Sequence, residues 1–152
     1  MNSPPRILYV DDDPDGCDMM SILLRDCFNY AVTAAADGRE ARELISTQDF
    51  DLFLLDYCLP DITGVDLCQS IRQLNAHVPI VIYSALDRDI DREKAMAAGA
   101  SKYLIKPDQL DSLRAELDQL LIQSSSNEMD QEIHSSVGHM ATRPKRKASG
   151  IV

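Results

Sequence analysis

Basic residues, paired cysteines and long apolar runs are scarce or missing in this sequence, and each shortage argues against a class of protein. Fifteen Lys and Arg residues against 25 Asp and Glu residues give a formal net charge of −10 at pH 7. This balance argues against a general nucleic-acid-binding protein, because such proteins use cations to contact phosphates. No apolar run approaches the ~18 residues of a membrane span, and no signal peptide opens the sequence. We therefore expect a soluble cytoplasmic protein that does not contact a membrane.

The four cysteines do not form a redox or metal-binding motif. Cys17, Cys27, Cys58 and Cys68 include no C-x-x-C pair. In a chain of this size they indicate reduced and mostly buried thiols.

The residues that the sequence does contain favour a single globular domain followed by a polar tail. The chain has 152 residues, of which 45% are hydrophobic, which is enough to bury the core of one domain of ordinary size. Residues 124–152 contain few large apolar side chains and end near the basic run 143–147. We predict a domain over residues 1–123 and a disordered tail over residues 124–152.

Within residues 1–123, short apolar segments alternate with amphipathic ones. The apolar segments are nearly continuous, a pattern typical of parallel strands buried on both faces. We predict strands over 6–10, 30–35, 51–55, 78–83 and 101–105. Apolar residues at three- and four-residue spacing predict helices over 14–28, 38–47, 64–74, 88–98 and 110–121. Asp13 should cap the first of these helices.

Five alternating strands and helices predict a doubly wound α/β fold, a flavodoxin-like (βα)5 three-layer sandwich. The strand order 2-1-3-4-5 is one of the two common solutions, and its switch point lies between the first and third strands. Ligand sites of such folds lie outside the carboxyl ends of the strands at this point.

The first and third predicted strands both end in carboxylates. Asp11 and Asp12 follow the first strand, and Asp56 follows the third. Carboxylates that converge repel one another unless a cation lies among them, and hard oxygen ligands suit Mg²⁺. We therefore expect Mg²⁺ at Asp11, Asp12 and Asp56, although each Asp alone would read as a solvated turn residue.

The ends of the fourth and fifth strands carry Ser84 and Lys106, which would have a use if Asp56 accepts a phosphoryl group. A carboxylate can attack phosphorus to form an acyl phosphate. Catalysis of phosphoryl transfer rests mainly on positioning and on charge stabilisation. Lys106 would supply a point charge, and the Ser84 hydroxyl would donate a hydrogen bond.

These residues, in this order, resemble the receiver domain of two-component response regulators, in particular single-domain receivers of the chemotaxis-regulator type. The resemblance covers about residues 5–123 and rests on five short segments: Ile7-Leu8-Tyr9-Val10-Asp11-Asp12, Leu54-Leu55-Asp56, Pro60-Asp61-Ile62-Thr63-Gly64, Tyr83-Ser84-Ala85 and Lys106-Pro107.

The resemblance implies roles for residues that the pattern alone does not assign. Asp56 would be phosphorylated by a histidine kinase or a phosphotransfer protein, and the backbone carbonyl of Cys58 would be a further Mg²⁺ ligand. Ser84 and Tyr103 would form the switch pair, and the Lys106–Pro107 peptide bond would be cis.

The resemblance also implies signalling to a downstream protein through the fourth helix, fifth strand and fifth helix, or homodimerisation on that face, rather than action as an enzyme. Two alternatives stay open. One is a receiver-like scaffold that is never phosphorylated. The other is an aspartate-nucleophile phosphohydrolase, against which Cys58 counts because that family places a second Asp two residues after the nucleophile.

Overall fold

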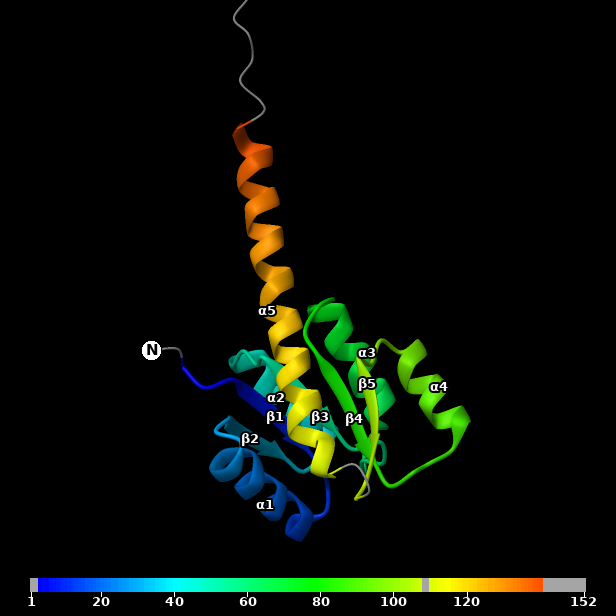
Figure 1. The fold of residues 1–152 in the computed structure, drawn as a ribbon. Helices are drawn as coiled ribbons and strands as arrows, with labels where there is room; N and C mark the ends of the chain where they lie inside the picture. Colours follow the sequence, from blue (N-terminus) through cyan, green and yellow to red (C-terminus); the bar gives the residue numbers. More distant parts are fainter. Residues whose placement is uncertain (1–2, 108–109, 141–152) are drawn as a thin grey trace, which may run out of the picture.

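A computed structural model of the chain describes residues 3–107 and 110–140. In this part of the chain, five parallel strands form one sheet in the order β2-β1-β3-β4-β5, as predicted (Figure 1). The strands are β1 (Arg6–Val10), β2 (Ala31–Ala35), β3 (Leu52–Leu55), β4 (Ile80–Ser84) and β5 (Lys102–Ile105).

The helices begin close to the predicted positions. They are α1 (Pro14–Ile22), the π-helical turn η1 (Leu23–Cys27), α2 (Gly38–Thr47), α3 (Gly64–Leu74), α4 (Asp89–Ala97) and α5 (Leu110–Met140). Side-chain caps explain three of these starts, because Asp13, Asp37 and Thr63 each accept a hydrogen bond from a backbone N–H in the first turn.

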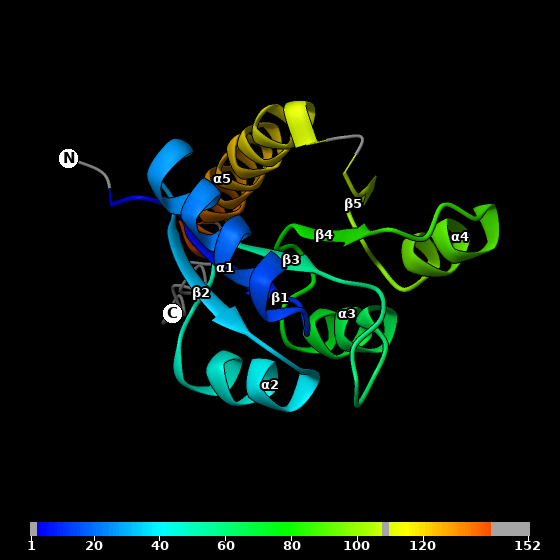
Figure 2. The ribbon, with the colours of Figure 1, turned by 90° about the horizontal axis from the view of Figure 1, so that it is seen from below.

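Two apolar cores lie on opposite faces of the sheet. Helices α1 and α5 cover one face, where Leu24 and Leu117 pack with Ile7 and Leu54. Helices α2, α3 and α4 cover the other face, and the view from below shows this division (Figure 2). Because both faces are covered, β3 and β4 are buried at every position. This burial accounts for the continuous apolar runs in the sequence.

Helix α5 is longer than the sequence indicated. It continues through residues 124–140, where a disordered tail was predicted from the polar composition, and residues 141–152 lie outside the described residues. The Ser125 and Ser126 hydroxyls donate hydrogen bonds to the carbonyls of Leu121 and Ile122, which lets polar residues remain within a helix. The polar composition of residues 124–140 therefore did not exclude a helix.

No helix in the described ranges is long and apolar enough to cross a membrane.

Candidate phosphoryl-acceptor site

The carboxylates of Asp11, Asp12 and Asp56 meet at the carboxyl edge of the sheet. The Asp56 N–H donates to the Val10 carbonyl at 2.8 Å, which holds the end of β3 beside the end of β1. One carboxylate oxygen from each of the three Asp residues lies within 4.8 Å of the others. Asp11 is buried, Asp56 is half-buried and Asp12 is exposed, so the group opens towards solvent on one side.

Lys106 lies between two of these carboxylates. Its Nζ is 2.7 Å from Oδ2 of Asp11 and 3.5 Å from Oδ2 of Asp56. The Lys106 N–H donates to the Ser84 carbonyl at 2.9 Å, which ties the end of β5 to the end of β4. The Lys106–Pro107 peptide bond is cis, the geometry that the sequence resemblance implied.

The pKa values of Asp11 and Asp56 depend on burial and on the Lys106 ammonium. Burial raises the pKa of Asp56, the Lys106 ammonium partly opposes the rise, and the Asp11 carboxylate adds to it. Burial also acts to raise the pKa of Asp11, but hydrogen bonds from Lys106, Tyr9 and the Asp13 backbone outweigh it, and the net pKa is lowered. Asp11 is thus held as a carboxylate beside Asp56.

The residues present fit a divalent magnesium ion. Asp11, Asp12 and Asp56 offer hard oxygen donors from three side chains, as Mg²⁺ prefers. The ammonium of Lys106 already serves as counter-ion to two of these carboxylates. This arrangement shows that the cluster favours positive charge.

The loop after Asp56 is held against the acceptor strand by close backbone contacts. Cys58 and Thr63 form an isolated antiparallel bridge, and the Gly64 N–H donates to the Tyr57 carbonyl at 2.7 Å. A Cβ on Gly64 would lie 2.0 Å from the Asp56 carbonyl oxygen, so a glycine is required by this approach. The side chain of Cys58 is exposed.

Asp61 in the same loop has a structural role. Its carboxylate accepts hydrogen bonds from the N–H groups of Gly38 and Arg39, both at 2.9 Å, at the start of α2. These contacts place the Asp61 side chain at the start of α2 and not in the carboxylate cluster.

Ser84 and Tyr103 converge on one residue of the β4–α4 loop. The Ser84 hydroxyl oxygen accepts from the Leu86 N–H at 3.2 Å, and the Tyr103 hydroxyl donates to the Leu86 carbonyl at 2.7 Å. Ser84 and Tyr103 are both buried. Two hydroxyl side chains, from β4 and β5, therefore hold the start of the loop that leads to α4.

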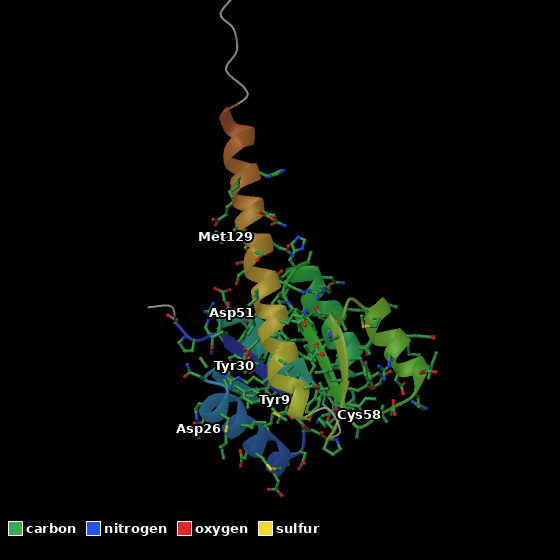
Figure 3. The ribbon with its side chains drawn as sticks, viewed as in Figure 1. Tyr9, Asp26, Tyr30, Asp51, Cys58 and Met129 are labelled. Carbon is green, nitrogen blue, oxygen red and sulfur yellow. The ribbon has the colours of Figure 1, made fainter. Side chains whose placement is uncertain are left out.

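The sequence interpretation missed two groups near the site. The Tyr9 hydroxyl donates a hydrogen bond to Oδ2 of Asp11 at 2.6 Å. Figure 3 shows Tyr9 and Cys58 towards the same end of the molecule.

The second group is Asp91 of α4, which is buried and accepts two hydrogen bonds from Arg88, at 2.6 and 3.0 Å. Burial raises the pKa of Tyr57 and the Asp91 carboxylate adds to the rise, so the two side chains lie close together. An aromatic residue in a strand looks like core, and an acidic residue in a charged helix looks solvated, so the sequence held no signal for either.

The fold and the acidic edge define a doubly wound α/β domain with a cluster of carboxylates at its switch point. Residues 7–118 match the family described as the response regulator receiver domain, and the chain belongs to this family.

Relatives of known name agree with this assignment. The chain is 37% identical over 120 residues to the transcriptional regulatory protein ZraR of Escherichia coli, covering 79% of this chain and 27% of that protein. It is 38% identical over 119 residues to the response regulator MprA of Mycolicibacterium vanbaalenii, covering 78% of this chain and 51% of that protein. The chain thus spans about half or less of these relatives.

Solved structures show the same fold. A CheY-like response regulator receiver domain protein from Methanospirillum hungatei superposes with a TM-score of 0.77 at 27% identity, covering 82% of this chain and 99% of that one. Members of this family are signalling proteins and are not generally enzymes.

Proposed function

We propose that this chain is a phosphorylation-controlled switch in which Asp56 accepts a phosphoryl group from a histidine kinase or a phosphotransfer protein in the cytoplasm. The observation that supports the proposal most strongly is the convergence of Asp11, Asp12, Asp56 and Lys106 at one edge of the sheet. A stable fold does not need three carboxylates within 4.8 Å of one another, since like charges repel.

In the proposed reaction, a carboxylate oxygen of Asp56 forms a bond to phosphorus while the bond from phosphorus to the donor's imidazole nitrogen breaks. The product is an acyl phosphate on Asp56. Mg²⁺ held by Asp11, Asp12, Asp56 and the backbone carbonyl of Cys58 would neutralise charge on the phosphoryl group. Lys106 would contact a further phosphoryl oxygen, since its Nζ already reaches Asp56.

We further propose that phosphorylation acts on the β4–α4 loop through Ser84 and Tyr103. Both hydroxyls bond to Leu86, so a Ser84 that turned to a phosphoryl oxygen would release the Leu86 N–H. Phosphorylation would thereby shift an existing equilibrium between two arrangements of the loop. The output would be a partner protein, or a second copy of the chain, at the face formed by α4, β5 and α5.

The test is intact-protein mass spectrometry after incubation with acetyl phosphate. We expect one phosphoryl mass gain that requires Mg²⁺ and disappears in Asp56→Asn, because the amide lacks the nucleophilic oxygen. Removal of Mg²⁺ with a chelator should abolish the gain in the wild type.

A matched control is Asp51→Asn, which neutralises an exposed carboxylate at the opposite end of β3. It should gain the phosphoryl group as the wild type does. The proposal fails if the wild type gains no mass from either acetyl phosphate or a panel of histidine kinases, or if Asp56→Asn gains it equally.

A further inference from the structure

The hydroxyl of Tyr9 lies inside the core and bonds to the buried acidic residue of the site. Tyr9 belongs to β1 and is 1% exposed, and its ring packs with Leu54 and Val81 on the face that α1 and α5 cover. Its hydroxyl donates a hydrogen bond to Oδ2 of Asp11 at 2.6 Å. A phenylalanine would fill the same space without burying a polar group, so packing alone does not account for this hydroxyl.

The carboxylate of Asp11 accepts hydrogen bonds at both of its oxygens. Oδ2 accepts from the Tyr9 hydroxyl and from Nζ of Lys106, which is 2.7 Å away. Oδ1 accepts from the Asp13 N–H at 3.0 Å. An ionised carboxylate offers about four lone-pair positions, two on each oxygen. Among the contacts of the described residues, the oxygen that keeps a free lone pair for a cation is therefore Oδ1.

The two donors to Oδ2 of Asp11 differ in how firmly they are held. The Lys106 ammonium ends a flexible side chain that is 23% exposed, and Oδ2 of Asp56 also lies within 3.5 Å of it. The Tyr9 ring is buried, and close packing restricts its movement. Burial raises the pKa of Tyr9 and the hydrogen bond to Asp11 adds to the rise, so the hydroxyl stays protonated and remains a donor. Tyr9 therefore keeps its hold on Asp11 when Lys106 contacts another group.

We propose that Tyr9 is a positioning residue for Mg²⁺, whose hydroxyl fixes the plane of the Asp11 carboxylate and so keeps Oδ1 available to the cation. The torsion that turns an Asp carboxylate has a broad minimum, so its orientation has to come from hydrogen bonds. The Asp13 N–H holds one oxygen and the Tyr9 hydroxyl holds the other. Loss of a partner that bonds to a metal ligand usually lowers metal affinity ~10–100-fold.

The inference rests on the proposed magnesium site, and its test measures Mg²⁺ binding to the full chain in the absence of a phosphoryl donor. The result therefore does not depend on whether Asp56 accepts a phosphoryl group. Tyr9→Phe should raise the Mg²⁺ dissociation constant by about tenfold in isothermal titration calorimetry, because the ring stays and only the hydroxyl is lost. The rise in melting temperature that Mg²⁺ causes in each variant gives a second measure, which compares the variant with itself.

The matched control is Tyr30→Phe. Tyr30 is a buried tyrosine of the same core, and its hydroxyl also donates to a carboxylate, that of Asp118 in α5. Asp118 lies outside the carboxylate cluster. Tyr30→Phe should therefore bind Mg²⁺ as the wild type does, whereas an effect of lost core stability on the cation would appear in both variants.

The dependence of phosphorylation on Mg²⁺ separates positioning from general damage to the site. At Mg²⁺ concentrations far above both dissociation constants, the rate at which Tyr9→Phe accepts a phosphoryl group from acetyl phosphate should return to within about twofold of the wild-type rate. A rate that stays low at saturating Mg²⁺ would show that the variant site is distorted, and would contradict a positioning role.

The outcomes for Tyr9 and for the proposed function can be told apart. A dissociation constant that is unchanged or lower in Tyr9→Phe, or that rises equally in Tyr30→Phe, would overturn the role of Tyr9 alone. A wild type that does not bind Mg²⁺ would overturn the magnesium site and this inference together. A tenfold rise confined to Tyr9→Phe, in a chain that gains no phosphoryl group, would support the role of Tyr9 and contradict only the proposed function.

Discussion

Gly64 illustrates how a residue without reactive groups positions Asp56. A Cβ at this position would lie 2.0 Å from the Asp56 carbonyl oxygen and 3.0 Å from its carbonyl carbon. Both atoms belong to the backbone at the end of β3, so the conflict cannot be relieved by a side-chain rotation. The spacing from Pro60 to Gly64 is readable in the sequence, but the contact that explains it is visible only in three dimensions.

We predict that Gly64→Ala destabilises the protein by about 1–3 kcal/mol, the usual cost of overpacking, and lowers the rate of phosphoryl acceptance at Asp56. Urea unfolding and the acetyl phosphate assay measure the two effects. The control is Gly16→Ala, where the nearest atom is the flexible carboxylate end of Asp13, at 2.8 Å. Equal stability and equal phosphorylation of the two variants would count against the role given to Gly64.

At the scale of residues, the sequence indicated the charged residues of the site but not the buried side chain that hydrogen-bonds to one of them. Asp11, Asp12, Asp56 and Lys106 stand at the ends of apolar runs, where polar side chains are conspicuous. Tyr9, which donates to Asp11, lies inside such a run and looks like any core aromatic. Periodicity cannot reveal a hydrogen bond made by the far end of a buried ring.

At the scale of elements, a polar contact links the loop after Asp56 to helix α4. Asp91 is buried at the start of α4, Arg88 donates two hydrogen bonds to it, and the Tyr57 side chain lies close to it from the β3–α3 loop. The hydrogen bond from Arg88 is the main cause that lowers the pKa of Asp91, against the opposing effect of burial. A displacement of Tyr57 on phosphorylation would therefore change the surroundings of Asp91 in α4.

We predict that Asp91→Asn lowers the melting temperature at neutral pH, because a buried charge-assisted contact is lost. A carboxyl whose folded pKa is lowered stabilises the protein above its ordinary pKa, and this stability is lost as the pH falls through the lowered value. The difference between wild type and Asp91→Asn should therefore shrink in acid, as thermal unfolding at a series of pH values would show.

Asp89→Asn provides the control, since Asp89 lies in the same first turn of α4 and is exposed. Asp89→Asn removes a charge from the same turn but leaves the contact of Asp91 with Arg88 intact. If the melting temperature of Asp89→Asn falls as far as that of Asp91→Asn, the loss of stability is due to the charge at the helix terminus alone.

Only the first part of helix α5 was predicted from the sequence. Its buried stripe through Leu113 and Leu117 was recognised, and its continuation through 124–140 was not. Residues 125–134 of the continuation are exposed, so the pattern of burial that identifies a helix was weak there.

At the scale of the whole molecule, topology brings distant residues to one place. The pairing of β1 with β3 sets Val10 beside Leu55, so the carboxylates that follow these strands become neighbours although Asp11 and Asp56 are 45 positions apart in the sequence. The parallel order β2-β1-β3-β4-β5 then adds Ser84 and Lys106 from the next two strands. This convergence was predictable, because buried parallel strands and crossover rules leave few alternatives.

Strand and helix boundaries were predictable to within about two residues for most elements, because turn and cap residues mark them. The contacts of Tyr57 and Tyr103 were not, because each depends on how a loop packs against α4 or β5. The convergence of Asp11, Asp12, Asp56 and Lys106 was thus predictable from the sequence, whereas the contacts that support them are visible only in the structure.

The most direct test of the account is to locate the phosphoryl group chemically. Reduction of the phosphorylated chain with borohydride converts an aspartyl phosphate to homoserine, which peptide mass spectrometry can place in the sequence. We predict homoserine at position 56 alone, and only when Mg²⁺ was present during phosphorylation. Homoserine at Asp11 or Asp12, or a phosphoryl group retained on a residue that borohydride does not reduce, would contradict the assignment of Asp56 as the acceptor.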